Sequence, residues 1–128
     1  MPDMDMREDY NRAVPADDVA RFSSQISKVV EKVTKLAGSA ANPADYAKEL
    51  IARICPTTLP YTIDSEAFFG LAGFNGRGLA DDAMDVMLAL TTNTALADGV
   101  TPDQRRIRAG FPYFGEPYTS SEQGAATK

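Results

Sequence analysis

Carboxylates gather in one short stretch of this 128-residue chain. Asp81, Asp82 and Asp85 lie near the start of a predicted helix, and Asp98 follows that helix in an Asp98-Gly99 turn. Such clusters suit Ca²⁺ or Mg²⁺, which take oxygen ligands. The stretch lacks the alternating ligands and distal glutamate of an EF-hand loop, and the helix dipole alone favours acids in a first turn. We therefore favour a structural role for these acids and predict no metal site.

A glycine-rich turn, Asn75-Gly76-Arg77-Gly78, comes directly before the acids. Its glycines permit positive φ, and Arg77 could pair with Asp81 or Asp82 through both guanidinium nitrogens as a brace. Alternatively, Arg77 and the free amides of the helix start could hold a phosphate or carboxylate. The neighbouring acids oppose an anion, so the brace is the favoured interpretation. The candidate binding residues are Asn75, Arg77, Asp81, Asp82, Asp85 and Asp98.

Large apolar side chains mark both ends of the chain. Four aromatic residues, Phe111, Tyr113, Phe114 and Tyr118, fall within eight positions beside two prolines. They either strap the core, which we favour, or present an exposed anchor to a partner. Near the other end, Tyr10 and Val14 are the sizeable apolar residues of an acidic stretch. The predicted partner contacts are Tyr10, Val14, Phe111, Tyr113, Phe114 and Tyr118.

The residues that are missing exclude several reaction classes. The chain has no histidine, so Ser-His-Asp, Cys-His and histidine-metal chemistry are excluded within it. Cys55 is the single cysteine, which rules out an intrachain disulfide, and its apolar neighbours favour a buried role. No glycine-rich stretch ends in Gly-Lys-Ser or follows a clear strand. We expect no cofactor and no catalytic residues.

Net charge bears on the choice of partner. The chain carries −5 overall with a pI near 4.6 and no extended basic patch, which opposes nucleic-acid binding. No run of 18 apolar residues is present, so no transmembrane segment is expected, although peripheral attachment to a membrane complex stays open. The acidic start lacks the apolar core of a secretory signal.

Hydrophobic spacing predicts a mainly α protein. Residues 1–16 are expected to form an extended acidic arm, 17–118 a single helical domain and 119–128 a flexible polar tail. Apolar residues at spacings of three and four predict helices over about 18–37, 43–55 and 80–92. The residues expected at their starts are Asp17 or Asp18 for the first, Asn42 for the second and the acids near 81 for the third. Between them, 56–74 reads as irregular, with a helical turn at 65–69 or a strand near 61–63. The expected fold is a small orthogonal or antiparallel bundle of three to four helices, with Pro/Gly/aromatic-rich connections and extended termini.

The motif series resembles a known family. Asn75-Gly76-Arg77, Asp81-Asp82, Asp85, Asp98-Gly99-Val100 and Phe111-Pro112-Tyr113 are similar to a series in the C-terminal part of the exported bacterial family called domain of unknown function 4331. The likeness covers roughly residues 46–118 and implies a C-terminal helical module. The family's β-rich N-terminal portion, with its Ser-His-Arg-Glu-Ala-Pro motif, has no counterpart here. The resemblance implies an exported or periplasmic location and no established activity.

Two functions remain open on these residues. The first is a non-enzymatic accessory or structural subunit that binds a larger protein assembly through its terminal arms. The alternative is a small ligand- or divalent-metal-binding module centred on the Asn75 to Asp85 turn and helix start.

Overall fold

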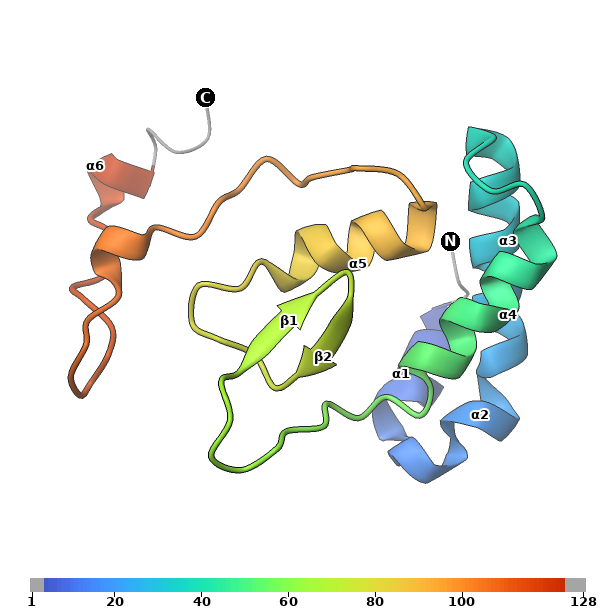
Figure 1. Cartoon of the computed structure of the whole chain (residues 1–128), viewed down its shortest axis with the longest axis horizontal. Coiled ribbons are helices and arrows are strands. Elements are labelled where there is room, and N and C mark those ends of the chain that lie inside the picture. Colours follow the sequence, from blue (N-terminus) through green and yellow to red (C-terminus); the bar gives the residue numbers. More distant parts are fainter. Residues whose placement is uncertain (1–3, 124–128) are drawn as a thin grey trace.

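Helices dominate the computed structural model, which describes residues 4–123 (Figure 1). The helices are α1 (Met4–Arg12), α2 (Asp18–Arg21), α3 (Ser23–Ala37), α4 (Pro43–Ile54), α5 (Ala83–Thr92) and α6 (Ser120–Gln123). Two 3-10 turns, η1 (Pro15–Asp17) and η2 (Gln104–Arg106), and two strands, β1 (Phe68–Gly70) and β2 (Gly73–Asn75), complete the elements. The predicted mainly α class is confirmed.

The N-terminal region is helical, so the extended arm predicted for 1–16 is wrong over residues 4–12. An Arg12–Glu8 ion pair of 3.0 Å spans one turn of α1. The Tyr10 hydroxyl hydrogen-bonds Thr57, and the Tyr10 ring meets Phe22 edge to face at 5.1 Å. These tertiary contacts hold α1 against Phe22, between α2 and α3, and against the loop after α4. Composition alone does not reveal them.

The helix predicted over 18–37 is broken at Phe22, whose φ of −120° ends α2 before α3 begins. Asp17 precedes α2 without a side-chain capping bond. Asp18 is buried instead, and its carboxylate accepts a 2.8 Å hydrogen bond from the Thr57 amide. This bond ties the start of α2 to the loop that follows α4.

The ends of α3 and α4 follow local signals. Gly38 adopts φ +62° and ends α3, as predicted. Asn42 caps α4 by accepting a hydrogen bond from the Asp45 amide, and Pro43 occupies the first turn. Pro56 follows the last turn of α4, where its preceding residue is already extended. The two helices pack side by side (Figure 1).

An antiparallel hairpin occupies part of the region expected to be irregular. In it, Phe69 faces Phe74, and their rings stack with centroids 4.4 Å apart. The expected helical turn at 65–69 is therefore partly strand, and residues 61–63 form no strand. Three-residue strands are too short to show an alternating pattern in sequence.

The core lies where α5 crosses α3 and α4. Its fully buried cluster consists of Val30, Ala47, Leu50 and Leu90. The α3–α4 connection is tied to the end of α5: Ser39 donates to the Thr92 carbonyl and Asn93 donates to the Ser39 carbonyl, both at 2.6 Å. Helix α5 begins at Ala83 rather than at the predicted residue 80, because Asp82 caps it.

The C-terminal unit, residues 103–122, stands apart from the helices in Figure 1. A linker leads to it from the end of α5 and runs back over that helix. The expected aromatic strap on the core is wrong, because Phe111, Tyr113, Phe114 and Tyr118 are all exposed. Within the flexible tail predicted for 119–128, Ser120–Gln123 form α6, and residues 124–128 lie outside the described range.

Candidate functional site

Asn75 fastens the hairpin to the loop before it. Its side-chain amide donates to the Ser65 hydroxyl at 2.8 Å and to the Glu66 carbonyl at 2.7 Å, and its oxygen accepts from the Thr62 amide at 2.8 Å. Gly76 follows with φ +71°, and a Cβ there would lie 2.8 Å from the Tyr61 ring. The first two residues of the candidate turn therefore have structural roles: they fix the hairpin against the loop before it.

Asp81 is the acceptor at the centre of the turn. One of its oxygens accepts hydrogen bonds from the Gly78 amide at 2.7 Å and from the Phe69 amide at 2.8 Å. Arg77 does not form the predicted two-nitrogen pair with an acid: it is exposed, and its guanidinium donates to the Asp81 backbone carbonyl at 3.4 Å. The brace exists, but the carboxylate and backbone amides form it rather than the arginine.

The other three acids converge beyond the start of α5. Asp82, Asp85 and Asp98 each bring a carboxylate oxygen within 4.8 Å of the others. Each also accepts a backbone hydrogen bond: Asp82 from the Asp85 amide (3.1 Å), Asp85 from the Asp98 amide (2.7 Å) and Asp98 from the Val100 amide (2.7 Å). We call these residues the carboxylate triad. They form no ion pair with any described residue.

An apolar groove runs beside the triad. It has a volume of about 350 Å³ and lies between α5, the β1–β2 turn and the start of the linker. We call it the α5 groove; its lining residues are Leu71, Asp85, Val86, Ala89, Ala95, Leu96 and Ala97. Because Asp85 belongs to both features, negative charge borders an otherwise apolar hollow.

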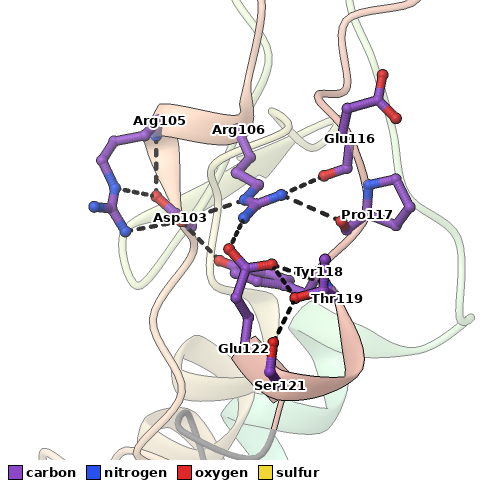
Figure 2. A network of polar contacts seen from close by, with 9 residues as sticks. All are labelled: Asp103, Arg105, Arg106, Glu116, Pro117, Tyr118, Thr119, Ser121 and Glu122. Carbon is purple, nitrogen blue, oxygen red and sulfur yellow. Dashed lines mark hydrogen bonds and ion pairs between the residues drawn. The ribbon is translucent and has the colours of Figure 1, made fainter.

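The C-terminal unit is held by its own polar network (Figure 2). Arg106 donates to the Glu122 carboxylate at 2.9 Å and to the Glu116 and Pro117 carbonyls, and its guanidinium lies 4.1 Å from the centre of the Tyr118 ring. The Tyr118 hydroxyl donates to Asp103 at 2.7 Å. Arg106 therefore links η2, the segment before α6 and α6 itself.

Hydrogen bonding changes the acidity of this network. Donation first from Arg105 and then from Tyr118 holds the pKa of the Asp103 carboxyl far below its ordinary value. The hydrogen bond between Tyr118 and Asp103 in turn raises the pKa of the Tyr118 hydroxyl. Backbone and hydroxyl donation from Thr119, with Arg106 nearby, lowers the pKa of Glu122. Both carboxylates are thus charged at neutral pH, as the network requires.

The network supports an exposed aromatic loop. Ile107 and Phe114 form an isolated antiparallel bridge, Arg108 donates its amide to the Tyr113 carbonyl at 2.7 Å, and Tyr113 donates to Gly110 at 2.8 Å. At the tip, Phe111 is 88% exposed and meets Tyr113 edge to face with centroids 6.0 Å apart. We call residues 107–114 the aromatic loop. Its predicted anchors are displayed to solvent.

The two N-terminal anchors differ from each other. Val14 is exposed between α1 and η1. Tyr10, in contrast, makes its contacts within the chain, with Thr57 and Phe22. Of the predicted pair, Val14 offers its side chain to solvent while Tyr10 positions α1.

Sequence reasoning missed the Asp103–Arg106–Glu122 network and the α5 groove. Asp103 and Tyr118 are fifteen residues apart, without a periodic pattern to relate them. The usable signal was the density of charges around Thr101-Pro102-Asp103 and Arg105-Arg106 beside aromatic residues. The groove had no signal, because it depends on how the linker returns along α5.

Comparisons with protein-family models, with curated proteins and with solved structures found no match. The resemblance to the domain of unknown function 4331 family therefore stays a prediction. Among the described residues, no helix combines the length and the apolar character needed to cross a membrane.

Proposed function

We propose that this chain is a non-enzymatic accessory or structural subunit of a larger protein assembly. In this proposal its body is a small bundle of helices, and its two terminal regions provide the contacts. The observation that carries it is the amount of surface left exposed. The chain exposes 9588 Å², whereas a compact monomer of 13.8 kDa is expected to expose about 6,600 Å².

The excess is about 3,000 Å² on this chain alone, more than the roughly 800 Å² that each partner contributes to a standard interface. The terminal regions expose large apolar side chains. Phe111 is 88% exposed, Phe114 60% and Val14 57%. Large exposed apolar patches are typical of surfaces that another protein covers.

The candidate binding residues support a non-catalytic role. Asn75, Asp81, Asp82, Asp85 and Asp98 all accept backbone hydrogen bonds that hold the hairpin, α5 and the linker. The carboxylates of a catalytic site are directed at a substrate rather than at the chain's own backbone. The acids here are instead explained by the backbone amides that they bind.

Native mass spectrometry of the tagged chain, isolated from its source, tests this proposal. We expect recovery in a fixed ratio with other polypeptides. Val14→Asp combined with Phe114→Asp should abolish that recovery, because both substitutions place charge in the proposed contacts. Ile63→Asp, at an apolar residue that is more exposed than either and lies outside the terminal regions, is the control and should retain the partners. Recovery of the unmodified chain without any other polypeptide would contradict the proposal.

A divalent-cation module centred on the carboxylate triad is the second candidate. The convergence of three carboxylates within 4.8 Å favours it, while their existing backbone bonds weaken it. A rise in melting temperature with millimolar Ca²⁺ or Mg²⁺, lost in Asp82→Asn, would favour this candidate. An unchanged melting temperature would remove it.

A further inference from the structure

The α5 groove is large enough for aromatic rings. An enclosed apolar cavity of about 150 Å³ binds benzene; the α5 groove is open to solvent and, at about 350 Å³, has room for at most roughly two rings. Leu71 and Leu96 on its walls are both about half exposed. Free energy is gained when an apolar side chain enters such a groove, because apolar surface on both sides is removed from water.

The aromatic loop carries side chains of the matching kind. Phe111, Phe114 and Tyr113 are 88%, 60% and 46% exposed. At 150–250 Å² for each buried aromatic residue, the two phenylalanines, which fill the room available in the groove, offer about 300 Å² for contact. The Asp103–Arg106–Glu122 network already fixes the unit that bears them, so little ordering would be needed on binding.

Charge is complementary between the two features. The carboxylate triad borders the groove without a cation among the described residues. The aromatic loop carries Arg108, which is exposed and likewise forms no ion pair with any described residue. The loop and the groove are therefore complementary. Both offer apolar surface, and the guanidinium on the loop can pair with the carboxylates beside the groove.

We propose that two copies of this chain associate reciprocally, with the aromatic loop of each copy seated in the α5 groove of the other and Arg108 facing the carboxylate triad. Every copy carries both features, so a twofold arrangement satisfies them all and closes the assembly. Two such contacts, counting loop and groove surfaces, bury about 1,200 Å², the lower limit for a specific and stable interface. The inference goes beyond the proposed function, because it concerns the purified chain without other polypeptides.

Sedimentation velocity of the purified full chain, over about a hundredfold range of concentration, tests the association. We expect a monomer–dimer equilibrium for the unmodified chain. Phe111→Ser with Phe114→Ser should raise the dimer dissociation constant at least about thirtyfold, as loss of central aromatic anchors does. Ile63→Ser, the control for exposed apolar surface, should leave it unchanged.

The groove is tested by Leu96→Arg, which fills it with a charged side chain. This variant should be as defective as the loop variant, whereas Leu36→Arg on the outer face of α3 should dimerise normally. Arg108→Asp should weaken the dimer about tenfold, and salt should weaken the unmodified dimer but affect this variant less.

A mixing experiment distinguishes reciprocal exchange from any other dimer. The loop variant keeps an intact groove, and Leu96→Arg keeps an intact loop. Mixed together, they should form a heterodimer through the one remaining loop–groove contact, although each is monomeric alone. Circular dichroism spectra matching the unmodified chain would show that both variants are folded.

Two results would overturn the inference: a monomer at every concentration, or a dimer that neither variant disturbs. If the purified chain is monomeric and still joins other polypeptides in its source, this inference fails while the proposed function stands. If the purified chain dimerises as described but is recovered from its source without other polypeptides, this inference stands and the proposed function fails.

Discussion

Asp81 shows how a residue typical of binding sites serves the fold instead. Its side chain lies within reach of two amides, on Phe69 and Gly78, that belong to different segments. By accepting both bonds, the carboxylate joins the hairpin to the segment that precedes α5. No metal ion is needed to connect them. The spacing of the acids is therefore explained by the amides that they meet.

Replacing Asp81 with alanine should destabilise the chain by about 1–3 kcal/mol, because two partly buried amides lose their acceptor. Arg77→Ala should change stability by less than about 0.5 kcal/mol, since Arg77 is exposed and makes one long hydrogen bond. Urea unfolding followed by circular dichroism measures both. If Arg77→Ala cost as much stability as Asp81→Ala, the arginine would contribute to the brace as much as the carboxylate, which would contradict this account.

Among the elements, those with strong end signals were predictable. Asn42, Pro43 and Pro56 indicated both ends of α4, and Gly38 indicated the end of α3. These signals act within one turn of chain, so no tertiary information is needed.

Elements that depend on distant contacts were missed. Helix α1 has a polar composition and is held by Tyr10 on Phe22 and Thr57. The hairpin has strands of three residues, tied to Asp81 and Asn75. In the candidate site, the convergence of Asp82, Asp85 and Asp98 was partly anticipated, but their backbone partners were not. Such pairings arise from the folded path of the chain and leave no period in the sequence.

The C-terminal unit should keep its network to unusually low pH. Hydrogen bonds lower the pKa of Asp103 in the folded chain, so its stabilising contribution is complete above the ordinary pKa near 3.8. That contribution is lost only as the pH falls through the lowered value. Carbon-13 NMR of the carboxyl group should therefore give a titration midpoint below 3.8.

Variants rank the causes of that shift. Arg105→Gln should raise the midpoint of Asp103 most, because Arg105 is its strongest partner, and Tyr118→Phe should raise it less. Glu116→Gln is the control: its backbone carbonyl, not its carboxylate, takes part in the network. An unchanged midpoint in Arg105→Gln would contradict this account.

At the scale of the whole molecule, the chain divides into a helical body and the C-terminal unit. The body is held by α3, α4 and α5, and its last tie to the linker is the Asp98–Asp85 hydrogen bond. Between described residues, the hydrogen bonds of residues 103–122 all lie within that unit. A separate unit with exposed aromatic residues, joined by a linker, suits contact between chains better than completion of one core.

Removal of residues 103–128 should therefore leave the body folded and change its free energy of unfolding by less than about 0.5 kcal/mol. Measurement at low protein concentration matters, because association of the full chain would add stability by mass action. Removal of residues 95–128 is the informative contrast. It also takes away Leu96 beside α5 and the Asp98 amide bound to Asp85, so it should cost about 1–2 kcal/mol. If the shorter deletion were as costly as the longer one, the C-terminal unit would belong to the core of its own chain, and the exposed surface would need another explanation.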